Sequence, residues 1–261
     1  MGSQRSMDSG LNWKGPRMTA DGIILIHAFP MDASMWSLQV KALRGETKVV
    51  AVNLPGFGGT ASAGDVMTMA AAAAKVASAA SRAGIARAMV CGLSMGGYVA
   101  LELWRQQPEL VAGLVLANTR ADADDAAAKE RRAGLASRLR SEGNGFMVES
   151  PPPLLSEAAP GVLWRRVKDV IARQPAASIA AAALGMAERA DSTADLARIK
   201  APTLVISATG DTLIAPAITK NIADGIEGSR YEAIEGAGHL SNLEAPERFN
   251  ELLAAHWRRL K

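Results

Sequence analysis

One serine, Ser94, stands between glycines in the stretch GLSMGG (92–97), which follows an apolar run and opens a helix-forming run. In a sharp strand-to-helix turn the serine backbone is strained and neighbouring groups come close, so Gly92 and Gly96 leave the necessary room. Such a turn presents the hydroxyl beside a helix N-terminus, whose free N–H groups favour negative charge. These residue types predict a serine nucleophile. The alternative, a cofactor-binding turn, is less favoured because the stretch lacks the G-x-G-x-x-G pattern.

A neutral serine becomes an effective nucleophile only when a base accepts its proton and a third group orients that base. The histidines of the chain are His27, His239 and His256. His27 ends an apolar run and His256 falls on the apolar face of a predicted helix, whereas His239 lies in a turn after the last strand run. We therefore expect His239 to be the base. Asp211 closes the run TLVISATGD and is the expected orienting acid, and Asp122, in the polar run ADADD, is the alternative.

Acyl transfer also needs donors for the negative charge that develops on the carbonyl oxygen. The backbone N–H of Met95, the residue after the serine, is the first expected donor. The second is expected from the loop after the first strand run, where the stretch HAFP (27–30) nominates the N–H of Phe29. Together these groups predict an oxyanion hole of two backbone amides.

The sequence contains six short apolar runs, separated by helical stretches, that are typical of strands and could position these groups. The runs are GIILIHAF (22–29), KVVAVNLPG (48–56), RAMVCGLS (87–94), LVAGLVLANT (110–119), APTLVISATGD (201–211) and SRYEAIEGAGH (229–239). Runs of this kind, bounded by turn residues and alternating with helices, predict a doubly wound, mostly parallel α/β sheet with helices on both faces. The serine, the aspartate and the histidine then all lie at the carboxyl edge of that sheet.

Helices are predicted over 33–43, 66–83 and 95–107, and again from Pro246. One apolar face of that last helix comprises Phe249, Leu252, Leu253, His256, Trp257 and Leu260. No strand run is found between about 119 and 199, and a long structureless loop is uncommon in a compact domain, so an inserted helical cap is expected there. Residues 20–118 and 200–261 are then the core, and residues 1–19 are read as a leader and N-terminal extension.

Composition is that of a soluble globular chain. Of the 261 residues, 49% are hydrophobic and 21% charged, and the net charge is +3, which leaves room for one full-sized core. The low aromatic content argues against a nucleic-acid groove, and no segment reads as an export signal or membrane span. The single cysteine, Cys91, excludes an intrachain disulfide and suits a cytoplasmic protein. Scattered histidines form no metal-ligand spacing, and neither a metal nor another cofactor is expected.

The motifs HAFP, NLPGFGGT, GLSMGG, SATGDTLIAP and GAGHLSNLEAPERF resemble the α/β-hydrolase superfamily, in particular its cap-bearing carboxylesterase and lactonase branch. The chain order Ser94, Asp211, His239 is the order of that superfamily. The resemblance implies the α/β-hydrolase fold with these three residues as the catalytic triad. Ala28 stands where the family usually has glycine, and the N-terminal portion is short for eight strands, so one or both leading strands are expected to be absent or rudimentary. GLSMGG and GHLSNLEAPERF also resemble the 3-oxoadipate enol-lactonases.

The expected function is a serine carboxylesterase that cleaves small, largely uncharged esters through an acyl-enzyme intermediate. Alternatives are an enol-lactonase of the 3-oxoadipate type, a cofactor-free perhydrolase, or a ligand-binding protein of the same fold with little turnover. A small-molecule ester or lactone is the expected partner, with no nucleic acid and no membrane. The substrate pocket is expected between sheet edge and cap, lined by Phe29, Met31, Trp36, Met95, Leu154, Leu155, Trp164 and Leu213.

Overall fold

The computed structural model describes residues 19–261 and contains one six-stranded sheet in which all neighbouring strands are parallel. The strands are β1 (Gly22–Ile26), β2 (Lys48–Val52), β3 (Ala88–Leu93), β4 (Val111–Ala117), β5 (Thr203–Ala208) and β6 (Arg230–Ile234). Their spatial order is β2-β1-β3-β4-β5-β6, so the winding direction reverses between β1 and β3. In open sheets of this kind ligands bind at the carboxyl ends of the strands beside that reversal. Ser94 directly follows β3.

All residues of the four inner strands β1, β3, β4 and β5 are buried, whereas the edge strands β2 and β6 are partly accessible. A parallel strand covered by helices on both faces can be apolar throughout, and this is why the strands are visible in the sequence as continuous apolar runs. The predicted doubly wound α/β fold is confirmed, and each of the six predicted runs contains one strand.

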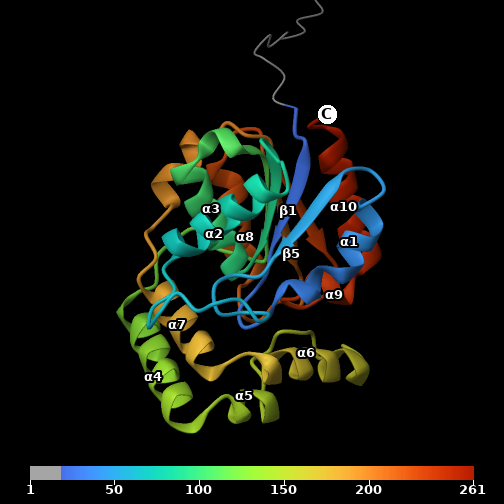
Figure 1. Ribbon diagram of the computed structural model, residues 1–261. Coiled ribbons are helices and arrows are strands. Elements are labelled where there is room, and N and C mark those ends of the chain that lie inside the picture. The colour runs from blue at the N-terminus through green and yellow to red at the C-terminus, as the bar shows by residue number, and fades with distance from the viewer. Residues whose placement is uncertain (1–18) are drawn as a thin grey trace, which may run out of the picture.

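Helices cover both faces of the sheet (Figure 1). On one side lie α2 (Met69–Arg82), α3 (Met95–Gln106) and α8 (Pro216–Gly225), and on the other lie α1 (Ser37–Leu43), α9 (Ser241–Glu244) and α10 (Pro246–Arg258). The helix expected over 33–43 is divided into a 3-10 turn, η1 (Ala33–Trp36), and α1. The helix expected from residue 66 begins later, because Thr68 caps it by accepting a hydrogen bond from the Ala71 N–H.

Between β4 and β5 the chain forms helices and leaves the sheet (Figure 1). These are α4 (Ala126–Glu142), α5 (Gly145–Glu149), α6 (Gly161–Arg173), α7 (Ala176–Ala187) and the 3-10 helix η3 (Thr193–Arg198), and α4 packs against α7. We call residues 119–199 the α4–α7 segment. It lies beyond one end of the sheet rather than on either face, and α7 is buried along most of its length.

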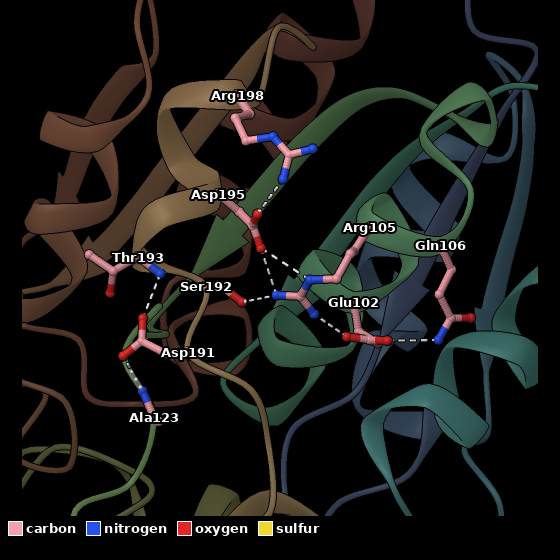
Figure 2. A network of polar contacts seen from close by, with 9 residues as sticks. All are labelled: Glu102, Arg105, Gln106, Ala123, Asp191, Ser192, Thr193, Asp195 and Arg198. Carbon is pink, nitrogen blue, oxygen red and sulfur yellow. Dashed lines mark hydrogen bonds and ion pairs between the residues drawn. The ribbon is translucent and has the colours of Figure 1, made fainter.

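The two ends of the α4–α7 segment meet at a neck. There the Ser192 N–H donates to the Ala121 carbonyl at 2.8 Å, and the Ala123 N–H donates to the Asp191 carboxylate at 3.1 Å. Figure 2 shows how α3 holds this neck: the Arg105 guanidinium donates to the Asp195 carboxylate and to the Ser192 hydroxyl. The segment is therefore tied to the helix that begins at Ser94.

Two further sequence predictions concern the N-terminal leader and the absence of a membrane-spanning segment. The leader expected over residues 1–19 lies outside the described residues, apart from Thr19. In the described part no single helix is long and apolar enough to cross a membrane, and α6 and α7 meet the criterion of length and composition only as a pair bent by 95°.

Candidate active site

Ser94 occupies the tight turn between β3 and α3. Its φ is +56°, a left-handed conformation that is strained for a side-chain-bearing residue. A Cβ on Gly92 would lie 2.1 Å from the Gly96 carbonyl oxygen, and a Cβ on Gly96 would lie 2.2 Å from the Ile26 carbonyl oxygen. Both glycines are therefore required by close backbone approach, and the second contact places the start of α3 directly against the end of β1.

His239 and Asp211 form a buried pair at the same edge of the sheet. His239 Nδ1 lies 2.8 Å from Asp211 Oδ2, and both residues are at most 5% exposed. Burial acts to raise the pKa of Asp211, but hydrogen bonds from His239, the Ile214 N–H and Asn118 outweigh it and hold that pKa below its ordinary value. Asp211 is thus an ionised carboxylate at neutral pH, and the pair leaves His239 Nε2 for another partner.

Ser94 and His239 line the same cavity. Within the described part of the chain, the Ser94 hydroxyl makes no hydrogen bond to the His239 ring. Such bonds are often long in a site without substrate. The alternative acid, Asp122, ion-pairs with Arg120 and makes no bond to His239. Of the two acids weighed from the sequence, the structure places Asp211 with the histidine.

The two other histidines are held elsewhere. His27 is fully buried; the Leu54 N–H donates to its Nε2 at 3.1 Å, and its Nδ1 bonds the Ala28 carbonyl at 2.9 Å. Burial lowers the pKa of His27 to about 4 and that of His256 to about 4, so both imidazoles are neutral in the folded protein. Neither lines the cavity that contains Ser94.

Asn118, which the sequence analysis missed, supports the Asp211 side chain. It directly follows β4 and has a φ of +45°; its Nδ2 donates to Asp211 Oδ2 at 3.0 Å, and its Oδ1 accepts from the Ser241 hydroxyl at 2.6 Å. The signal available in the sequence was an asparagine directly after a buried strand run, at the edge where the other polar groups meet. Asn tolerates left-handed backbone better than most residues.

Two backbone amides near Ser94 lack partners. In the described part of the chain, neither the Phe29 N–H nor the Met95 N–H donates a hydrogen bond to another group of the protein. Phe29 follows β1, and the contact between Gly96 and Ile26 brings that loop beside the serine turn. Unpaired amides are uncommon in a buried region, and here they are available to an oxygen of a bound molecule.

The cavity at Ser94 has a volume of about 690 Å³. Of the side chains expected to line it, Phe29, Leu154 and Leu213 do so. The others lie outside its lining: Met31, Trp36, Met95, Leu155 and Trp164. Trp36, for example, is fully buried in the core, where its ring centroid is 5.9 Å from that of Phe249, so its bulk fills space between helices instead of facing the cavity.

Apart from Ser94 and His239, the polar and charged lining residues were not anticipated from the sequence. The cavity wall includes Tyr98 of α3, Arg120 after β4, and Arg132 and Arg138 of α4. No group of three or more His, Cys, Asp or Glu side chains within residues 19–261 is arranged to hold a metal ion. The arginines come from the α4–α7 segment or its start, where the sequence carries no recognisable pattern.

Comparison with known proteins gives a consistent result. The profile of the alpha/beta hydrolase family matches residues 23–252. A thermophilic esterase from Thermogutta terrifontis, solved with malate bound, is 37% identical, with a TM-score of 0.89 over 93% of this chain and 91% of that one. An enol-lactonase structure from Burkholderia xenovorans is 28% identical, with a TM-score of 0.83 over 92% of each chain. The 3-oxoadipate enol-lactonase 1 of Acinetobacter baylyi is 28% identical over 92% of this chain and 89% of its own length.

Proposed function

Because the chain belongs to the alpha/beta hydrolase family, we propose that it is a serine hydrolase that cleaves small carboxylic esters through an acyl-enzyme intermediate. The observation that carries the proposal is the buried His239–Asp211 pair, whose histidine lines the same cavity as a serine in a strained turn. Relatives named as esterases and enol-lactonases support hydrolysis of a C–O bond next to a carbonyl.

In the first half of the proposed reaction, His239 Nε2 accepts the Ser94 proton while Oγ attacks the ester carbonyl. The carbonyl π electrons move to its oxygen, which becomes an oxyanion held by the Met95 and Phe29 amides. Asp211 keeps the ring in one tautomer by accepting from Nδ1–H, and it stabilises the imidazolium. When the tetrahedral intermediate collapses, the C–O bond to the alcohol breaks and the leaving alkoxide takes the proton from Nε2.

In the second half a water molecule repeats the sequence on the acyl-enzyme. His239 accepts a proton from the water, the hydroxide adds to the acyl carbon, and collapse expels Ser94, whose oxygen recovers the proton. The acid is released and the serine is restored. We assign residues 119–199 as a cap over this site, because α4 and α5 side chains complete the cavity wall.

Enol-lactone hydrolysis is the second candidate, favoured by the names of two of the relatives. The chemistry is unchanged, except that the leaving oxygen stays tethered to the acyl group and the ring opens. A hydrolase-fold binder with little turnover would use the same cavity without the serine chemistry.

The test is hydrolysis of p-nitrophenyl esters from acetate to long acyl chains, beside an enol-lactone, by wild type and Ser94→Ala. We expect turnover of short acyl chains and a loss of at least about 10³-fold in kcat for the variant, because the nucleophile is removed. A strong preference for the lactone would move the assignment to the enol-lactonase. Turnover that persists in Ser94→Ala, or its absence in wild type, would overturn the catalytic role of this serine.

A further inference from the structure

The cavity beside Ser94 carries more positive charge than an uncharged ester requires. Arg120, Arg132 and Arg138 line it, and Glu149 is the one acidic side chain among its described lining residues. Arg138 is half exposed and ion-pairs with Glu142, so its charge is balanced and screened by solvent. The side chains of Arg120 and Arg132 are only 31% and 23% exposed, so their charges act within the cavity.

The arginines behind this wall outnumber the carboxylates that pair with them directly. Arg120 makes a two-point ion pair with Asp122, with Nε 2.8 Å from Oδ1 and Nη2 bonded to Oδ2. Asp124, whose side chain is 2% exposed, serves two guanidinium groups: Arg132 Nε bonds its Oδ2, and Arg189 Nη1 lies 2.7 Å from its Oδ1. In direct ion pairs these three guanidinium groups share two carboxylates, and Asp191, which interacts with Arg189 electrostatically, makes no ion pair with any of the three in the described part of the chain.

Of the two guanidinium groups that share Asp124, Arg132 is the one in the cavity wall. Arg189 is almost fully buried, lies 4.3 Å above the Tyr98 ring, and gives its N–H groups to Asp124 and to the Asp122 and Met186 carbonyls. Arg132 uses Nε for Asp124 and Nη1 for a contact with the Met186 sulfur at 3.5 Å. Its Nη2 has no partner in residues 19–261, and Arg132 is a cavity residue whereas Arg189 is not.

Tyr98 adds a second donor next to the nucleophile. It lies four residues after Ser94, one turn along α3 on the same side, and it lines the same cavity. Its hydroxyl makes no hydrogen bond within the described part of the chain. Burial raises the pKa of Tyr98, although the nearby arginines Arg189, Arg132 and Arg120 oppose that effect, so the hydroxyl keeps its proton at neutral pH and can donate it in a hydrogen bond.

We propose that Arg132 and the Tyr98 hydroxyl bind a carboxylate at the end of the substrate remote from the reacting ester, so that the preferred substrates are half-esters of dicarboxylic acids. The guanidinium supplies charge, the phenol supplies a directional hydrogen bond, and the apolar wall of Phe29, Leu154 and Leu213 contacts the chain between the two functional groups. This inference rests on the proposed function, and it replaces the largely uncharged ester expected from the sequence.

Two esters that differ only at the remote end test the proposal: monomethyl adipate, which carries a carboxylate, and methyl hexanoate, which carries a methyl group in its place. Methanol release gives kcat and KM for each. We expect wild type to prefer the half-ester by at least about tenfold in kcat/KM. Arg132→Gln should lower kcat/KM for the half-ester about 10- to 100-fold, mainly through KM, and Tyr98→Phe should lower it several-fold.

The matched control is Arg131→Gln, which removes the same charge from the neighbouring, exposed position of α4 and should leave both esters unaffected. The neutral ester controls for structure: Arg132→Gln and Tyr98→Phe should change its hydrolysis by less than about threefold. Equal losses on both esters, or no preference of the wild type for the half-ester, would overturn the carboxylate site.

A binding measurement separates failure of this site from failure of the catalytic proposal. Adipate dianion should raise the thermal midpoint of wild type and of Ser94→Ala, uncharged adipamide should not, and Arg132→Gln should abolish the shift. If adipate raises the thermal midpoint but wild type hydrolyses no ester, the carboxylate site is supported and the proposed reaction is refuted. If ester hydrolysis depends on Ser94 but adipate does not change the thermal midpoint, the carboxylate site is refuted and the proposed reaction stands.

Discussion

The Asp211 carboxylate is held from four directions. Its Oδ1 accepts the Leu213 and Ile214 N–H groups at 2.9 and 3.0 Å, and its Oδ2 accepts from Asn118 and from the His239 ring. A carboxylate bonded in this way stays ionised and keeps one orientation, and it passes that orientation to the imidazole. The backbone donors come with the turn after β5, whereas Asn118 is a separate side chain whose effect can be measured.

Asn118→Ala should therefore reduce kcat about 5- to 30-fold with little change in KM for methyl hexanoate. Loss of a hydrogen bond to a buried carboxylate costs about 1 to 2 kcal/mol, and the cost falls on the orientation of His239 rather than on ester binding. Steady-state kinetics would measure kcat and KM separately. Ser241→Ala, which removes the bond to the other end of the Asn118 amide, should have a smaller effect; the reverse ranking would contradict this account.

Among the elements, α3 connects the chemistry to the α4–α7 segment. Its first residue follows Ser94, its first turn carries Tyr98, and its last turn carries Arg105, which holds the neck (Figure 2). The helix can start where it does only because Gly96 meets the backbone at the end of β1 without a side chain. A displacement of α3 would alter the nucleophile, the Tyr98 side chain and the neck together.

Gly96→Ala tests that packing. The added methyl would lie 2.2 Å from the Ile26 carbonyl oxygen, so the backbone must move, and we expect a loss of about 1 to 3 kcal/mol in the free energy of unfolding together with a large loss of activity. Gly134→Ala in α4 is the control, because a Cβ there meets nothing within 4 Å and should stabilise the helix by up to about 1 kcal/mol. Urea denaturation would measure both. A Gly96→Ala variant as stable and active as wild type would refute the close approach.

The whole molecule responds to acid through two buried histidines that do not line the cavity. His27 is buried under the loop after β2, and His256 is buried on α10, where Arg230 and Arg259 add to the effect of burial. Each pKa is about 4 in the folded state and about 6.5 when unfolded. Between these values the unfolded chain binds more protons, so stability is fully present above pH 6.5 and is lost as the pH falls toward 4.

From pH 7 to pH 5 each histidine should lower the free energy of unfolding by about 2 kcal/mol. His256→Leu removes one titrating group, so the variant should lose about 2 kcal/mol less than wild type over the same interval. Urea titrations at a series of pH values would show the difference in slope. Parallel curves for the two proteins would mean that His256 does not titrate between the folded and unfolded states.

The sheet was predictable from the sequence, and the cavity was predictable only in part. Buried parallel strands form apolar runs in the sequence, and the polar residues that end those runs meet at one edge of the sheet. This reasoning paired Asp211 with His239, and the two side chains lie 2.8 Å apart. Trp36 and Met31 were misplaced because an apolar side chain in a core and one in a cavity wall have the same sequence signature. Arg132 was missed because its position depends on how α4 packs on α7, and no local pattern encodes that packing.

The neck between Ala121 and Ser192 also bears on how such a chain can diversify. A backbone hydrogen bond joins the two ends of the α4–α7 segment. The segment is therefore attached to the sheet at one fixed point, whatever the length of the chain between those ends. Helices of another length or composition could be exchanged there without moving β4 or β5. Ser94, Asp211 and His239 lie on the retained side of that junction, and Arg132 lies on the exchangeable side. The contribution of Arg132 to selectivity can thus be lost or engineered separately from the reaction, whereas that of Tyr98 stays with α3 on the retained side.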